Sequence, residues 1–220
     1  MGHGGTHDRA GVMRVAIVTS ISQNIAGMVS LTLANRMEYC LRHGYSLICD
    51  YKEYSDACAG VATLVPLLDV YDIIWTLDAD AVITDMSKRI ESLPCLGPHV
   101  TVCEEGIVTW NLLNCGSMVW RNTEQSREIL RSITASYSEW RHLPCGWQSW
   151  LGGRVYELAD TLKVAPIRSF NSCEWNQPGG GIGPDGSHWQ PGDFVYHPCG
   201  VFPAEEKLRR VSHSLLQVRQ

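Results

Sequence analysis

The arrangement of apolar and polar positions in the first third of the chain predicts strands that alternate with helices. Three short apolar runs are typical of buried strands, namely residues 14–19, 45–50 and 72–77. Apolar positions at helical spacing predict a helix over residues 28–41, which Gly44 is suited to end, and another over residues 59–70. Because strand–helix–strand units are right-handed, this order predicts a parallel sheet.

The pattern after residue 100 favours a mixed or antiparallel arrangement. It predicts short strands over residues 100–104, 107–110, 115–120, 162–166 and 194–197, with a turn at residues 105–106. It also predicts helices over residues 123–137, where Thr123 is suited to the N-cap, and over residues 204–216. The Gly- and Pro-rich residues 177–186 fit neither element and indicate a loop.

Together these elements predict an α/β fold with one domain over residues 13–220. Its sheet is expected to be Rossmann-like and mixed, with a parallel N-terminal half flanked by helices. Residues 1–12 are rich in Gly and His, have no apolar period, and are expected to form a disordered leader. In open α/β sheets ligands bind beyond the carboxyl ends of the strands. The polar residues that the predicted strands deliver there are Thr19, Ser20, Asp50, Asp78 and Asp80.

Composition narrows the class of protein. Its 220 residues carry 18 basic and 23 acidic side chains, and the net charge of −5 argues against a surface built to neutralise nucleic acid. No apolar run approaches the roughly 18–20 residues that a membrane span needs. We therefore expect a cytoplasmic protein, or a catalytic domain cut from a longer one. The nine cysteines are scattered without a Cys-x-x-Cys pair, which favours buried free thiols over a zinc site or disulfides.

The sharpest local signal is Asp78-Ala-Asp80 at the end of an apolar strand. Two hard carboxylates one residue apart can bind one divalent cation, and oxygen ligands suit magnesium or manganese better than zinc. The alternative is that both residues only end the strand and begin a turn. His197 ends another apolar strand and can supply a third ligand, although a histidine there can also be an ordinary hydrogen-bonded residue. Taken together, the three residues favour a metal site.

These motifs resemble a known family, the yeast galactosyltransferase and mannosyltransferase-complex family that includes plant xyloglucan xylosyltransferases. The segments that carry the resemblance are Asn35-Arg36, Tyr39-Cys40, His43-Gly44-Tyr45, residues 74–83, Leu113-Asn114-Cys-Gly116, Arg121-Asn122, Trp147-Gln148, Phe170-Asn171-Ser172, and residues 192–197 with Gly200. The ordered set is far rarer than any one motif, and it runs from about residue 14 to the end of the chain. The chain is expected to differ from the family in being short, in lacking its membrane anchor and stem, and in its Gly-rich loop.

The resemblance implies a glycosyltransferase A-type fold and a retaining transferase that uses a nucleotide-diphosphate sugar, above all a UDP-sugar, with manganese or magnesium. By carry-over, Asp78, Asp80 and His197 match the metal ligands, and Gln148 matches the glutamine near the reacting sugar. In this scheme the donor-binding positions are Thr19, Ser20, Asp50, Asp78, Asn114, Gly116, Gly200 and Lys207. Asp193 is expected to orient sugar hydroxyls or, alternatively, to serve only in the strand turn.

The identity of the acceptor is left open by the sequence. A hexose or pentose would pass to a hydroxyl of a glycan or of a hydroxymethylated DNA base, as in some phage enzymes, and a soluble bacterial or viral type of enzyme is expected. Two other classes remain: a sugar- or metal-binding module without turnover, and a metal-dependent nucleotide-sugar hydrolase. Discrimination among sugars depends on a few hydroxyl contacts whose geometry the sequence does not reveal.

Overall fold

The computed structural model of the protein describes residues 13–22, 26–51, 57–105, 112–175 and 189–220. The strands are β1 (Val15–Ile21), β2 (Ser46–Tyr51), β3 (Ile73–Leu77), β4 (Val82–Ile83), β5 (Val100–Glu104), β6 (Leu113–Arg121), β7 (Leu162–Ala165), β8 (Ser172–Trp175) and β9 (Val195–Gly200). The helices are α1 (Ala26–His43), α2 (Ala57–Ala62), α3 (Leu64–Leu67), α4 (Glu124–Ala135), α5 (Tyr137–Trp140), α6 (Trp147–Gly152) and α7 (Ala204–Leu215), with short 3₁₀ turns η3 (Ile90–Ser92) and η4 (Ile167–Ser169).

The described strands form two sheets. The larger sheet has six strands in the order β2-β1-β3-β6-β5-β7. β1 is parallel to β2 and β3, whereas β6 is antiparallel to both β3 and β5. The smaller sheet has three strands in the order β4-β9-β8, with β9 antiparallel to β4 and parallel to β8. The expected mixed sheet with a parallel N-terminal half is therefore confirmed.

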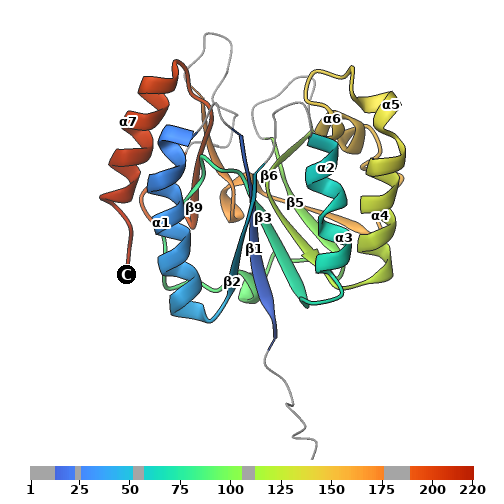
Figure 1. Ribbon diagram of the computed structural model, residues 1–220, viewed down its shortest axis with the longest axis horizontal. Helices are drawn as coiled ribbons and strands as arrows, with labels where there is room; N and C mark the ends of the chain where they lie inside the picture. Colours follow the sequence, from blue (N-terminus) through green and yellow to red (C-terminus); the bar gives the residue numbers. More distant parts are fainter. Residues whose placement is uncertain (1–12, 23–25, 52–56, 106–111, 176–188) are drawn as a thin grey trace, which may run out of the picture.

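Helices cover both faces of the larger sheet, with α1 and α7 on one side and α2, α3 and α4 on the other (Figure 1). The alternation of side chains along β3 explains how one strand serves both layers. Ile74 packs with Leu64 on the α3 side, whereas Ile73 and Trp75 pack with Tyr39 of α1. No helix within the described ranges is both long enough and apolar enough to cross a membrane.

Most of the predicted elements are present, and the differences have local causes. Gly44 ends α1 with a φ of 73°, as expected. The helix predicted over residues 59–70 is instead split into α2 and α3, because Pro66 has no N–H to donate to the Ala62 carbonyl. The helix predicted over residues 123–137 ends at Ala135, and α5 follows it.

Four short elements were not predicted from the sequence, namely β4, α5, α6 and β8, and neither were the 3₁₀ turns η3 and η4. The Thr123 side chain caps α4 by accepting a hydrogen bond from the Ser126 amide at 3.3 Å, as predicted. The predicted leader, the strand over residues 107–110, the turn at 105–106 and the Gly-rich loop at 177–186 lie wholly or partly outside the described residues, so they stay predictions.

Candidate functional site

The candidate site begins where β3 ends. The Asp78 amide donates to the Gly116 carbonyl at 2.7 Å, and the Ala81 amide then turns back to the Asp78 carbonyl at 2.9 Å. This turn interrupts the alternation of the strand, so that the carboxylates of Asp78 and Asp80 can both approach one neighbour. That neighbour is His197 of β9, whose Nε2 lies 3.3 Å from Asp80 Oδ1 and 3.6 Å from Asp78 Oδ2.

Helix α1 holds this turn in place through two adjacent side chains. The guanidinium of Arg36 donates to Thr19 Oγ1 at 2.7 Å, to the Ala81 carbonyl at 3.0 Å and to the Asp78 carbonyl. Asn35 exchanges two hydrogen bonds of 2.9 Å with the backbone of Ile83 in β4. Burial lowers the pKa of Arg36 to about 10, which leaves the side chain charged at neutral pH. The sequence analysis used Asn35-Arg36 only as part of a motif and assigned neither residue a role.

The three candidate ligands differ in exposure and charge. The His197 side chain is 2% exposed and that of Asp80 14%, whereas the Asp78 side chain is 61% exposed. Burial disfavours the charged imidazole, but the neighbouring Cys199, Asp80 and Asp78 outweigh burial and raise the pKa of His197 to about 9. Lys207 Nζ lies 2.7 Å from Asp80 Oδ2. Although burial opposes it, His197 and Lys207 hold the pKa of Asp80 well below its usual range.

The donor set fits a hard divalent cation. The ligand atoms of Asp78, Asp80 and His197 all lie within 4.8 Å of one another. Two carboxylates with one imidazole are chemically suited to manganese or magnesium. The backbone also makes room for this set, because a Cβ atom at Gly116 would lie 2.1 Å from His197 Cε1 and 2.9 Å from Asp78 Oδ2. Glycine at this position therefore lets His197 pack against the aspartate turn.

A chain of buried hydrogen bonds orients the imidazole from its other side. His197 Nδ1 lies 2.9 Å from Asn171 Oδ1, and Asn171 Nδ2 donates to Asn114 Oδ1 at 2.8 Å. Asn114 Nδ2 in turn donates to Glu105 Oε2 at 3.1 Å. Because Asn171 Nδ2 is the donor to Asn114, the Asn171 side-chain oxygen must accept from Nδ1–H of His197, and Nε2 remains the atom that faces Asp80. Asn171 and Glu105 were given no role by the sequence analysis, although Asn171 stands in one of the quoted motifs.

Five further predicted residues lie beside this network, on β6, α6, β9 and α7. Gln148 of α6 accepts a hydrogen bond from the Cys115 amide at 2.8 Å, which places its side chain next to Gly116. The Gly116 amide donates to Asn114 Oδ1 at 3.0 Å. Lys207 of α7 also donates to the Cys199 carbonyl at 3.4 Å, directly before Gly200 at the end of β9. The structure thus brings Gln148, Asn114, Gly116, Gly200 and Lys207 to the surroundings of the three candidate ligands.

The residues predicted near the nucleotide lie on β1 and β2. Ser20 pairs with Asp50 in the parallel register, Ser20 is exposed, and Thr63 Oγ1 donates to Asp50 at 3.3 Å. Thr19 is fully buried and its hydroxyl accepts from Arg36. This arrangement favours a structural role for Thr19, while ligand contacts of Ser20 and Asp50 stay predictions.

Asp193 is engaged in a local network. Its carboxylate accepts from Arg168 at 2.7 and 3.0 Å and from the Gln190 amide at 2.9 Å, next to Gly192 with a φ of 107°. These bonds favour the alternative given for this residue, a structural role in the strand turn. A contact between Asp193 and sugar hydroxyls stays a prediction.

Comparison by sequence finds plant relatives. No protein-family model matches the chain. The rice (Oryza sativa) protein named probable glycosyltransferase 4 is 30% identical over 112 residues, which are 44% of this chain and 23% of that protein. Probable glycosyltransferase 2 from rice is 27% identical over 113 residues, 45% of this chain and 23% of that protein. The match thus spans less than a quarter of the length of these relatives.

Comparison by structure finds solved glycosyltransferases. One is an enzyme involved in glycosylation of the major capsid of PBCV-1, with a TM-score of 0.67, 16% identity, and coverage of 92% of this chain and 99% of that one. Another is the galactosyltransferase LgtC in complex with donor and acceptor sugar analogs, with a TM-score of 0.58, 13% identity, and coverage of 93% and 96%. At these identities the likeness establishes the fold alone, and the expected glycosyltransferase A-type fold is confirmed.

Proposed function

We propose that this chain is a metal-dependent glycosyltransferase that moves a hexose or pentose from a UDP-sugar to an acceptor hydroxyl with retention of configuration. The observation that carries the proposal is the cluster of Asp78, Asp80 and His197, whose ligand atoms lie within 4.8 Å of one another in a fold shared with solved glycosyltransferases. The narrower relationship, to the yeast mannosyltransferase-complex and plant xylosyltransferase family, forms part of the same proposal and rests on the motifs quoted above.

The metal site and Lys207 would both place positive charge near the donor diphosphate. Asp78, Asp80 and His197 would hold Mn²⁺ or Mg²⁺, which supplies positive charge to a departing diphosphate. Lys207, 2.7 Å from Asp80, adds a second positive charge beside the site and is placed to approach phosphate oxygens near Gly200. Because only 14% of the Asp80 side chain is exposed, its interactions are weakened little by solvent.

The sugar is proposed to lie against β6 and α6. Asn114 and Gly116 line this region, and Gln148 is tied to it by its bond from the Cys115 amide. A glutamine here would hold a fixed, neutral amide dipole beneath the anomeric carbon. Such a fixed dipole can stabilise the positive charge of an oxocarbenium-like transition state. Since retention then proceeds without a covalent sugar–enzyme bond, the residues have to position the acceptor hydroxyl and exclude water.

The acceptor is proposed to be a glycan. LgtC was solved with an acceptor sugar analog, and the PBCV-1 enzyme is involved in glycosylation of a capsid. A modified DNA base gains no support from these relatives, and the net charge of −5 counts against a nucleic-acid surface. The nucleoside of the donor is proposed to lie near Ser20 and Asp50, at the parallel edge of the sheet.

The proposal is tested by donor turnover with UDP-glucose, UDP-galactose, UDP-xylose and GDP-mannose, each with Mn²⁺ or EDTA. Release of UDP from one donor that requires Mn²⁺ and is accelerated by added saccharides is the expected result. Donor binding without any release would instead support a binding module, and release that no saccharide accelerates would support a hydrolase.

A further inference from the structure

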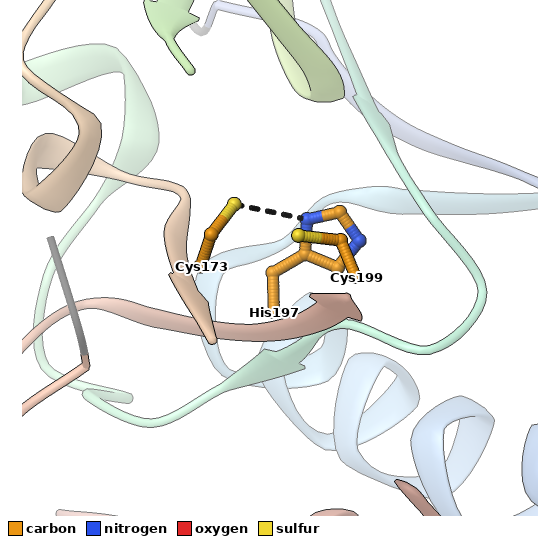
Figure 2. Close-up of side chains that lie close together, drawn as sticks. All are labelled: Cys173, His197 and Cys199. Carbon is orange, nitrogen blue, oxygen red and sulfur yellow. Dashed lines mark hydrogen bonds between the residues drawn. The ribbon is translucent and has the colours of Figure 1, made fainter. Parts of the chain in front are cut away.

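A second group of metal-ligating side chains shares His197 with the aspartate site. Cys173 of β8 and His197 and Cys199 of β9 offer ligand atoms that all lie within 4.8 Å of one another. Cys173 stands opposite His197 in the parallel register, and Cys199 follows two residues later on the same face of β9. Figure 2 shows both sulfur atoms on the side of the imidazole that carries Nδ1, with Nε2 turned away.

The geometry of this group suits a soft, tetrahedral cation. Cys173 Sγ lies 3.7 Å from His197 Nδ1, and the Cys199 sulfur completes a set whose ligand atoms all lie within 4.8 Å of one another. Zinc–sulfur and zinc–imidazole bonds in a tetrahedral site place the two ligand atoms about 3.5 Å apart. Cys173 is fully buried, whereas Cys199 is partly exposed and leaves an approach for an ion. Thiolate and imidazole ligands favour Zn²⁺ over Mn²⁺ or Mg²⁺.

We propose that Cys173, Cys199 and Nδ1 of His197 form a second metal site, which takes Zn²⁺ and competes with the Asp78–Asp80 site for the same imidazole. The two sites use opposite nitrogens of one ring. For a hard cation, Nδ1–H donates to Asn171 Oδ1 and the Nε2 lone pair faces Asp80. For Zn²⁺ the ring adopts the other tautomer: Nε2–H donates to Asp80 Oδ1 at 3.3 Å, and Asn171 Oδ1, now 2.9 Å from Nδ1, gives up its hydrogen bond to the ring.

The proton balance of this exchange is simple. Zn²⁺ displaces one proton from each thiol, and both protons leave to solvent as the two Zn–S bonds form. The imidazole keeps a single proton, which moves from Nδ1 to Nε2 by exchange with water. Three protein ligands leave the fourth position of the zinc for a solvent molecule. No oxidant or reductant is required, because all three side chains keep their oxidation states.

Cobalt is a suitable probe of this site, because a thiolate-to-Co²⁺ charge-transfer absorption reports sulfur ligands directly and needs no sugar donor. We expect this absorption in the reduced wild-type protein, its retention in Cys95→Ser, and its loss in Cys173→Ser and Cys199→Ser. Cys95 serves as the matched control because it is also a partly exposed free thiol but lies outside the cluster. Absence of the band from reduced wild-type protein, or its persistence in both variants, would overturn the proposal.

Competition is measured separately, by Mn²⁺ paramagnetic resonance with and without Zn²⁺. Loss of the shared imidazole is expected to weaken Mn²⁺ binding by more than about tenfold, because losing an outer-shell partner alone costs that much. Zn²⁺ that enters the aspartate site itself would displace Mn²⁺ from the wild type and from Cys199→Ser equally well. The difference between the two proteins therefore measures the Mn²⁺ displacement that requires the Cys199 sulfur. Equal competition by Zn²⁺ in the wild type and in Cys199→Ser would contradict the shared use of His197. Because neither readout involves sugar transfer, failure of the proposed enzymatic function would leave both results interpretable.

Discussion

At the scale of single residues, the site depends on how closely its neighbours approach His197. Gly116 packs against one side of the ring, and Asn171 accepts a hydrogen bond from its Nδ1. Neither contact involves a charged partner, yet both determine where Nε2 points. We therefore expect substitutions of the uncharged residues around the proposed metal ligands to change metal affinity.

Gly116→Ala is expected to weaken Mn²⁺ binding. The added methyl group would lie 2.1 Å from His197 Cε1, so the ring has to move away from Asp78. We expect a loss of at least about tenfold in Mn²⁺ affinity, comparable to the loss of an outer-shell partner. Gly153→Ala is the control, because its methyl group would meet only carbonyl oxygens at 3.6 Å. Equal Mn²⁺ affinities of the two variants, measured by calorimetry, would show that the ring does not need this space.

Asn171→Leu is expected to affect both stability and metal affinity. The substitution leaves Nδ1 of His197 without its oxygen partner, which costs about 1–3 kcal/mol, whereas Asn114 Oδ1 keeps the hydrogen bond from the Gly116 amide. Mn²⁺ affinity should fall about ten- to a hundredfold, because the tautomer is no longer fixed. Urea unfolding and Mn²⁺ titration measure the two effects. Lower stability with unchanged Mn²⁺ affinity would show that Asn171 supports the fold but does not orient His197 for metal binding.

Glu105 is expected to make the free energy of unfolding depend on pH. Burial raises its pKa from 4.5 to about 7, although the hydrogen bond from Asn114 and the charge of His197 oppose the increase. The folded protein therefore holds this proton more tightly than the unfolded chain, and stability falls as pH rises through 4.5 towards 7 and stays lower above it. Relative to Glu105→Gln, the wild type should lose up to about 3 kcal/mol over this window. Urea unfolding with EDTA below and above the window checks this, and a pH-independent difference between the two proteins would contradict it.

At the scale of elements, the turn between β3 and β4 depends on α1. Arg36 reaches three acceptors from this helix, two of them carbonyls in the turn itself. The planar fork of a guanidinium can satisfy them together, whereas a lysine ammonium at the end of a flexible chain cannot match the same geometry. The aspartate site is therefore coupled to the docking of a helix that supplies no metal ligand.

Arg36→Lys is expected to destabilise the fold by about 2–3 kcal/mol, because at least one buried, charge-assisted hydrogen bond is lost. Arg42→Lys on the same helix is the control. Among the described residues Arg42 pairs with Glu38 and Gln220 at the surface, so its replacement should cost less than about 0.5 kcal/mol. Urea unfolding compares the two, and equal stabilities would mean that the guanidinium fork is not needed to hold the turn.

The elements that could be predicted are those with enough residues to show a period. α1 and β3 were predicted within two residues at each end, and Gly44 marked a helix end correctly. In contrast, the six residues of α6 are too few to show a helical period, and β8 (Ser-Cys-Glu-Trp) contains no aliphatic residue, whereas β7, also four residues long, has Leu162 and Val164. α6 carries Gln148 and β8 carries Cys173. The positions of these two side chains depend on tertiary packing, which the local sequence does not reveal.

At the scale of the whole molecule, the site forms where the smaller sheet meets the end of the larger one. Asp78 and Asp80 follow β3 of the larger sheet, whereas His197 lies on β9 of the smaller sheet. The sequence indicated these three ligands through residue type, strand ends and family resemblance. It gave no distances across the fold, so the contacts from His197 to Asn171 and the two thiols could be found only in three dimensions.

The central claim is that Asp78, Asp80 and His197 hold a divalent cation that sugar transfer requires. The most direct test compares Asp80→Asn with Asp69→Asn, an exposed carboxylate outside the site, by Mn²⁺ titration and donor turnover on the same preparations. We expect Asp80→Asn to fold normally, to lose at least about tenfold in Mn²⁺ affinity and to show no measurable transfer, while Asp69→Asn matches the wild type. Wild-type Mn²⁺ affinity and turnover in Asp80→Asn would contradict it.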